Sequence, residues 1–156
     1  MLAATHMIFG SGCALLAAHV MGLPPDQAIV MTAAGVIGSL LPDMDHPSST
    51  FGRRIRPVSD LIGFVFGHRG ITHSLIAVFA LATLLAERAN IPVWGIGLIV
   101  GYLSHLLGDW LTPAGIPLLW PNKSRWSSPF PFRTGSFTEK IFGIATVAAG
   151  LVLAIK

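Results

Sequence analysis

The stretch IPVWGIGLIVGYLSHLLGDWL, residues 91–111, decides the fold class of this chain. It is apolar over most of its length, shows no alternation of period two and is too long for a typical strand, so it predicts a helix. Near its end His105 and Asp109 stand four residues apart, which places both side chains on one face of that helix. One segment therefore combines a membrane-type apolar helix with two residue types that bind metals.

Four further apolar segments have the same character, and they cover residues 7–22, 27–41, 72–86 and 141–155. Each has about 15 to 16 residues and gives a helix of about 24 Å, short of a hydrocarbon core of about 30 Å. Only 11% of the residues are charged, against roughly 25% in soluble domains. We expect one all-α domain over residues 1–156, a polytopic membrane helical bundle with about four or five spans. The alternative is a soluble or peripheral helical bundle.

Prolines separate the segments and leave two long loops, residues 42–71 and 112–139. Both loops are basic. The residues concerned are Arg53, Arg54, Arg56 and Arg69 in the first and Lys123, Arg125, Arg133 and Lys140 in or beside the second. Five alternating spans would put both loops on one side, which the positive-inside rule makes cytoplasmic.

The basic residues also bear on partners and targeting. The sequence pI is near 9.6, but no dense basic run occurs, so we expect anionic membrane lipid as the partner and no nucleic acid. The single Cys13 excludes a disulfide framework and a cysteine-based zinc site. No Lys or Arg precedes Arg53, so we expect no cleavable signal peptide.

Histidines and aspartates gather at the helix ends assigned to the cytoplasmic side. They are His6, His46, His68, His73, His105, Asp43, Asp45 and Asp109. His19 is the exception, because it lies thirteen residues beyond His6, about 20 Å along a helix, and we expect a structural or interfacial role for it. The glycines of residues 35–38 and 95–101 are expected to permit close helix packing rather than to bind phosphate.

Imidazole nitrogen and carboxylate oxygen together bind zinc, manganese or iron, and bridging carboxylates hold two ions close together. The sequence therefore predicts a site for one or two divalent ions, with zinc expected first. Its predicted ligands are His6, Asp43, Asp45, His68, His73, His105 and Asp109. In the alternative interpretation His105 and Asp109 form a hydrogen-bonded pair at a helix end, and Asp43 and Asp45 are solvated turn residues.

Residues 67–74, GHRGITHS, combine two glycines, two imidazoles and a guanidinium before an apolar helix. We expect Thr72 to cap that helix, leaving backbone N–H groups and Arg69 available for an anion such as phosphate. A capped helix start flanked by positive charge is the alternative. Arg69 and His46 are the candidate catalytic residues, although His46 could be a ligand, a base or neither.

Four of these motifs resemble the YdjM family of bacterial inner-membrane proteins, which are described as metal-dependent hydrolases. The motifs are Thr5-His6, Leu41-Pro42-Asp43-Met44-Asp45-His46, His68-Arg69-Gly70-Ile71-Thr72-His73-Ser74, and His105 with Asp109 and Thr112. The similarity extends from residue 6 to about residue 120. It implies a multi-pass protein of the inner membrane. The mixture of histidine and aspartate ligands is also distantly similar to that of zinc-dependent phospholipase C, but this chain has fewer histidines.

The motifs and the resemblance together favour a membrane-bound hydrolase of a phosphoester, with a phospholipid or lipid-linked phosphate as the substrate. The metal would activate water and polarise the phosphoryl oxygen, and Arg69 would stabilise the developing negative charge. A metal transporter and a metal-stabilised membrane regulatory module are the alternatives. The sequence leaves the substrate, the identity of the metal and the oligomeric state open.

Overall fold

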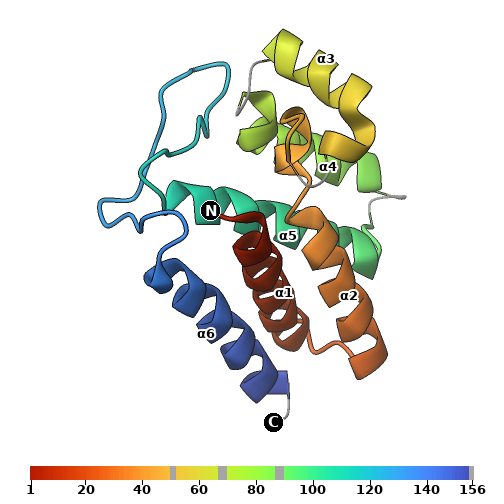
Figure 1. The fold of residues 1–156 in the computed structure, drawn as a ribbon. Coiled ribbons are helices and arrows are strands. Elements are labelled where there is room, and N and C mark those ends of the chain that lie inside the picture. The colour runs from red at the N-terminus through yellow and green to blue at the C-terminus, as the bar shows by residue number, and fades with distance from the viewer. Residues whose placement is uncertain (50–51, 67–69, 87–89, 155–156) are drawn as a thin grey trace.

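A computed structural model describes residues 1–49, 52–66, 70–86 and 90–154. All secondary-structure elements within these ranges are α-helices or short 3-10 helices. The elements in chain order are α1 (Ala3–Val20), α2 (Pro25–Gly38), η1 (Pro42–Asp45), η2 (Gly52–Ile55), α3 (Arg56–Phe66), η3 (Ile71–His73), α4 (Leu75–Leu85), α5 (Val93–Trp110) and α6 (Phe137–Ala154). Figure 1 shows their arrangement. The prediction of an all-α protein is confirmed.

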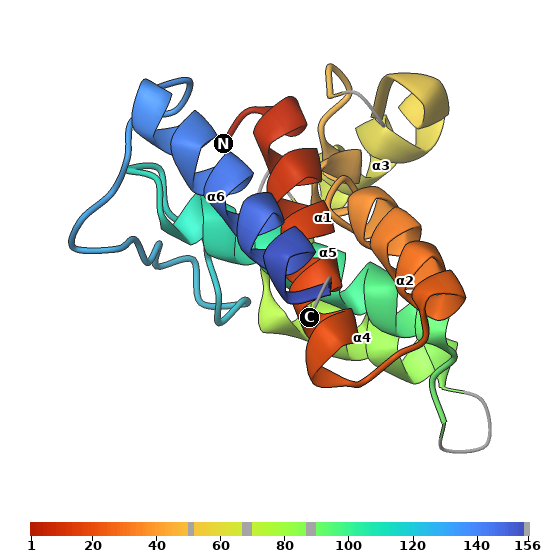
Figure 2. The same ribbon diagram turned by 90° about the horizontal axis from the view of Figure 1, so that it is seen from below.

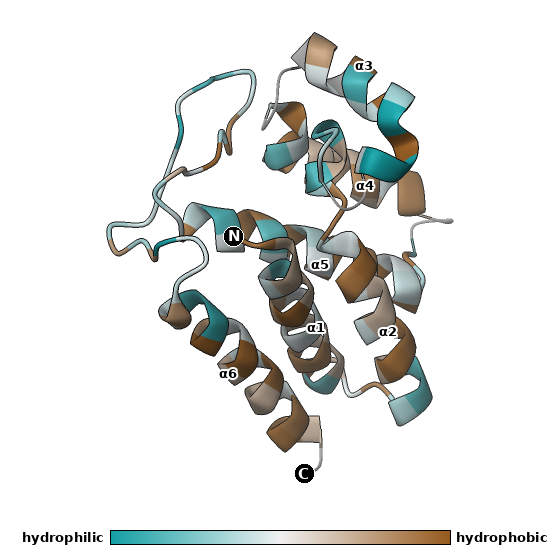
Figure 3. Cartoon of the chain, viewed as in Figure 1, coloured by the Kyte–Doolittle hydropathy of each residue, from teal (hydrophilic) through white to brown (hydrophobic). Residues whose placement is uncertain are grey.

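Three stretches of the described chain are long and apolar enough to cross a membrane: Ala3–Val20, Pro25–Asp45 and Phe137–Ala154. They contain α1, α2 and α6, which are brown over most of their length in Figure 3. The count is lower than the expected four or five. α4 is too short with 11 residues, and α5 has 18 residues but carries glycines and the polar residues His105 and Asp109.

Glycines allow α2 and α5 to cross with their backbones in contact. A Cβ added at Gly38 would lie 2.2 Å from the carbonyl oxygen of Leu98, and one added at Gly101 would lie 2.0 Å from that of Gly35. Real Cβ atoms do not approach so closely, so only glycine fits at either position. The expected role of these glycines in close helix packing is confirmed.

The helices bring several chain segments to one end of the molecule, the upper part of Figure 1. α1 begins and α2 ends there, next to η1, and α6 begins at the left of the figure beside the segment that follows α5. The buried carboxylate of Glu139 ties two of these starts together. It accepts hydrogen bonds from the backbone N–H groups of Leu2, at 3.0 Å, and Gly135, at 2.8 Å.

Residues 42–71 were expected to be a loop, and this expectation is wrong for their described part. They hold η1, η2, α3 and the start of η3, because Pro42 begins a short 3-10 turn and residues 56–66 alternate polar and apolar side chains with helical spacing. The predicted helix cap is also wrong. α4 begins at Leu75 with Ser74 as its N-cap residue, and the Thr72 hydroxyl instead donates a hydrogen bond to Asp45 Oδ2.

Candidate metal centre

Side chains from four elements converge at the end of the bundle just described. α5 supplies His105 and Asp109, η3 supplies His73, η1 supplies Asp43, and α1 supplies His6. The histidines and Asp109 are at most 1% exposed, whereas the Asp43 side chain is 25% exposed. The cluster is therefore closed on most sides and meets solvent at Asp43.

Two imidazole nitrogens and two carboxylate oxygens of this cluster face one another. His73 Nε2 lies 3.7 Å from Asp43 Oδ1 and 3.8 Å from Asp109 Oδ2. His105 Nε2 lies 3.7 Å and 3.9 Å from the same two oxygens. Tetrahedral zinc with ligand distances of about 2.1 Å separates its ligand atoms by about 3.4 Å. Asp43, His73 and His105 each offer a ligand atom within 4.8 Å of the others, so these three residues could share one ion, with Asp109 beside them.

The tautomer of His105 is fixed by the end of α2. Its Nδ1 lies 2.7 Å from the carbonyl oxygen of Ser39, which can only accept, so Nδ1 donates the hydrogen bond. In the neutral ring Nε2 then carries the lone pair. This buried atom has no hydrogen-bond partner within the described ranges, and it faces Asp43 and Asp109. A histidine held in this way is prepared to bind a metal through Nε2.

His73 is oriented by a second set of hydrogen bonds. The Thr72 hydroxyl donates to Asp45 Oδ2 at 2.7 Å and, having one hydrogen, accepts from His73 Nδ1 at 3.1 Å. The Tyr102 hydroxyl in turn donates to the backbone carbonyl of Thr72. His73 therefore also turns its Nε2 lone pair toward Asp43 and Asp109.

A second group of possible ligands overlaps the first and consists of His6, His105 and Asp109. His6 Nε2 lies 3.2 Å from Asp109 Oδ1, the oxygen that the amino group of Met1 also contacts. The His6 ring stacks on His105 with a centroid distance of 3.7 Å. The geometry is compatible with one ion or with two neighbouring ions.

The charges of the cluster match a divalent cation. Asp43 and Asp109 bring two carboxylates beside the imidazoles; Asp109 Oδ1 pairs with the Met1 amino group, whereas Asp109 Oδ2 and Asp43 Oδ1 face His73 and His105 and can balance the charge of a cation. Two carboxylates and two imidazoles form a donor set that zinc, manganese and iron accept. The described residues therefore fit the predicted type of cofactor.

The structure brings five of the seven predicted ligands together: His6, Asp43, His73, His105 and Asp109. Asp45 is buried, but it lies behind His73, with its Oδ2 atom 3.9 Å from His73 Nδ1, and belongs to neither group of possible ligands. His46 is also in neither group, and its Nδ1 lies 2.8 Å from the Ser48 hydroxyl. His68 and Arg69 lie outside the described residues.

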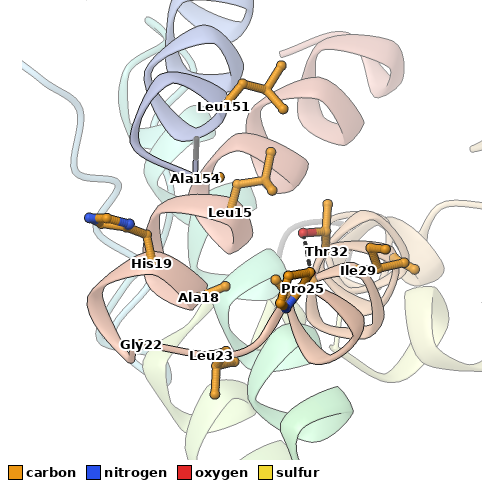
Figure 4. Close-up of a pocket in the computed structure, with 12 residues that line it drawn as sticks. Leu15, Ala18, His19, Gly22, Leu23, Pro25, Ile29, Thr32, Leu151 and Ala154 are labelled. Atoms are coloured by element: carbon orange, nitrogen blue, oxygen red, sulfur yellow. Dashed lines mark hydrogen bonds between the residues drawn. The ribbon is translucent and has the colours of Figure 1, made fainter. Parts of the chain in front are cut away.

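His19 lies at the far end of α1, exposed to solvent, on a pocket of about 800 Å³ between α1, α2 and α6 (Figure 4). Its ring points away from Ile29 and Thr32 on the other side of the pocket. Among the described residues that line this pocket, His19 is the only titratable one. The expectation that His19 stands apart from the metal cluster is confirmed.

Several residues that shape the cluster were not singled out from the sequence. Thr72 was expected to cap a helix and not to link Asp45 with His73. Tyr102 precedes His105 by three residues on α5, a spacing that could have pointed to it. The Ser39 carbonyl and Glu139 act through backbone contacts that carry no signal in the sequence.

Apolar helices of membrane-spanning length and a buried His/Asp cluster at one end define a helical membrane protein with a candidate metal centre. Comparison with known proteins shows the family to which it belongs. The chain belongs to the YdjM family: the family model described as "YdjM inner membrane protein" matches residues 1–155. The resemblance found in the sequence motifs is confirmed.

Relatives are found in Escherichia coli and in Bacillus subtilis. "Inner membrane protein YdjM" of Escherichia coli (strain K12) is 44% identical over 138 residues, covering 83% of this chain and 70% of the relative. "Uncharacterized protein YvsG" of Bacillus subtilis (strain 168) is 39% identical over 152 residues, covering 96% and 89%. No solved structure is significantly similar to this chain. The name of the Escherichia coli relative specifies a membrane location, and neither name specifies a reaction.

Proposed function

We propose that this protein is a membrane-bound, metal-dependent hydrolase that acts on a phosphoester, with a phospholipid or lipid-linked phosphate as its substrate. The observation that carries the proposal is the convergence of His73 Nε2, His105 Nε2 and the carboxylates of Asp43 and Asp109. The family membership supports the membrane location.

The protein's own residues prepare the centre in two ways. The Ser39 carbonyl holds His105, and the pair Thr72 and Asp45 holds His73, so both rings present Nε2 without reorganisation. A divalent ion held there supplies Lewis-acid activation of water and of a phosphoryl oxygen. Asp43 lies on the exposed side of the cluster, where a substrate phosphate would enter.

Metal content is the first test of this proposal. Protein purified in mild detergent should contain at least one zinc, manganese or iron ion per chain by elemental analysis. His105→Ala and His73→Ala should reduce this content to a small fraction, because each removes a ligand from the group of Asp43, His73 and His105. His19→Ala is the matched control and should keep the ion. Equal metal content in all four proteins would refute the centre.

Hydrolysis is tested separately with p-nitrophenyl phosphate, bis-p-nitrophenyl phosphate and phosphatidic acid. Turnover by the wild type and by His19→Ala, but not by His105→Ala, would support the proposal. A centre that joins α1, η1, η3 and α5 also suits the alternative of a metal-stabilised module. A bound ion without turnover of any of these substrates would favour that alternative.

Arg69 stays the predicted residue for stabilising negative charge on the phosphoryl group. Arg69→Gln should retain the ion and lower kcat by about 100-fold or more, the usual effect of removing one such donor. The measurement pairs elemental analysis with turnover of the best substrate. Arg133→Gln, an exposed arginine of the other basic segment, is the control. Loss of the ion in Arg69→Gln would instead indicate a structural role.

A further inference from the structure

Helix α3 carries large apolar side chains on its exposed side. Ser59 and Gly63 lie on the side toward the protein: Ser59 is completely buried, and a Cβ added at Gly63 would be 3.0 Å from the Asp45 carbonyl oxygen of η1. Val58 is 49%, Leu61 is 62% and Phe64 is 89% exposed.

In water, exposure of the three large apolar side chains of α3 is unfavourable. At a membrane interface the same side chains would be buried among acyl chains, which is favourable. Amphipathic helices lie in the plane of the interface with the apolar face in the acyl boundary and basic residues among the headgroups. α3 has 11 residues and offers one such face.

Basic side chains accompany this face at the start of the helix. Arg53, Arg54 and Arg56 are all exposed. A pocket of about 380 Å³ lies between Pro47, Ser48, Arg53 and Arg56. Two guanidinium groups at one pocket complement a phosphate, which they can bind with paired hydrogen bonds.

The position of α3 agrees with a membrane surface. α3 lies at the end of the molecule where α1 begins and α2 ends, and these are two of the helices long and apolar enough to span a bilayer (Figure 1). Figure 3 shows polar and apolar residues alternating along α3, in contrast with the later turns of α6, where brown prevails. An in-plane helix at this level would sit beside the headgroups.

We propose that α3 is an interfacial helix that docks on anionic phospholipid, with Val58, Leu61 and Phe64 in the acyl boundary and the headgroup phosphate in the pocket between Arg53 and Arg56. The partner is the lipid of the protein's own bilayer. This site is distinct from the metal cluster and does not depend on hydrolase activity. Because α3 rests on η1, which carries Asp43, docking would also fix one wall of the metal cluster.

The depth of α3 is the first test. A Cys13→Ala background carries an NBD label at Phe64→Cys or, as the control in an exposed polar segment away from α3, at Asn122→Cys, and the protein is placed in nanodiscs of phosphatidylcholine with phosphatidylglycerol. Lipids with a nitroxide at acyl carbon 5 should quench residue 64 several-fold more than residue 122, and aqueous iodide should show the reverse order. Equal access of iodide to both labels would overturn the proposal.

The phosphate pocket is tested by lipid selectivity. Spin-labelled phosphatidylglycerol and phosphatidylcholine are compared for their association with the protein in nanodiscs. Arg53→Gln with Arg56→Gln should lower the preference for phosphatidylglycerol by about fivefold per arginine removed, the value expected for a basic residue at an anionic surface. Lys123→Gln with Arg125→Gln removes the same charge from the other basic segment. An equal loss of preference in both double variants would overturn the pocket.

Discussion

Thr72 shows how one hydroxyl can decide the state of a neighbouring ligand. Its single hydrogen goes to Asp45, so the oxygen is left to accept from His73 Nδ1. The result is a carboxylate, a hydroxyl and an imidazole in series, with the far nitrogen of the ring directed at the cluster. Such outer partners keep a ligand in the correct tautomer and raise its affinity for metal.

Replacing Thr72 by Val should therefore weaken metal binding by about 10- to 100-fold, although no ligand is removed. The change keeps the shape of the side chain but leaves Asp45 and His73 without their shared partner. Competition with a chromogenic chelator measures the affinity. Thr72→Ser restores the hydroxyl and should recover most of it. If Thr72→Val binds metal as tightly as the wild type, the hydrogen-bond series has no role in the centre.

At the scale of elements, the crossing of α2 and α5 determines where the ligands stand. His105 lies one turn beyond Gly101 on α5, and Ser39, which holds His105, directly follows Gly38 on α2. Backbone contact at the glycines therefore sets the distance between the ring and its hydrogen-bond acceptor. A wider crossing would separate them.

Gly101→Ala should lower the stability of the protein by about 1–3 kcal/mol, because overpacking forces the helices apart. Its Cβ would lie 2.0 Å from the Gly35 carbonyl oxygen. Gly143→Ala in α6 is the control, since its Cβ would meet only side-chain atoms at 3.4 Å or more and a helical alanine is favoured over glycine by roughly 0.5–1 kcal/mol. Thermal unfolding in detergent should give a lower Tm for the first variant alone.

At the scale of the whole molecule, the cluster joins segments that are far apart in the chain. The candidate ligands run from His6 to Asp109 and come from α1, η1, η3 and α5. A ligand that binds only the folded state stabilises it by mass action. An ion in this cluster would therefore hold the upper part of the bundle together.

Removing the metal with a chelator should lower the Tm, by an amount equivalent to about 2.7 kcal/mol when the free ion stands at 100 times its Kd. Differential scanning fluorimetry before and after chelation, and after adding zinc back, measures the effect. Asp43→Asn should begin with a lower Tm and show little further change. A chelator effect of full size in Asp43→Asn would mean that the stabilising ion sits elsewhere.

The sequence by itself determined the helical class, the apolar segments and the shared face of His105 and Asp109, because these follow from composition and from the local period of a helix. It also indicated that histidines and aspartates gather at one end of the bundle, because alternating membrane-spanning helices place these helix ends on the same side. It did not reveal α3, on which Val58, Leu61 and Phe64 are exposed.

The tertiary structure alone decided how the residues divide their roles. Asp43 and Asp45 are two residues apart and chemically identical, yet Asp43 faces both His73 and His105 while Asp45 lies behind His73. The direction of each carboxylate depends on η3 and α5, which pack against η1 from distant parts of the chain. The Ser39 carbonyl that fixes His105 is 66 residues away from it. Such contacts arise only when the helices cross, so no local pattern encodes them.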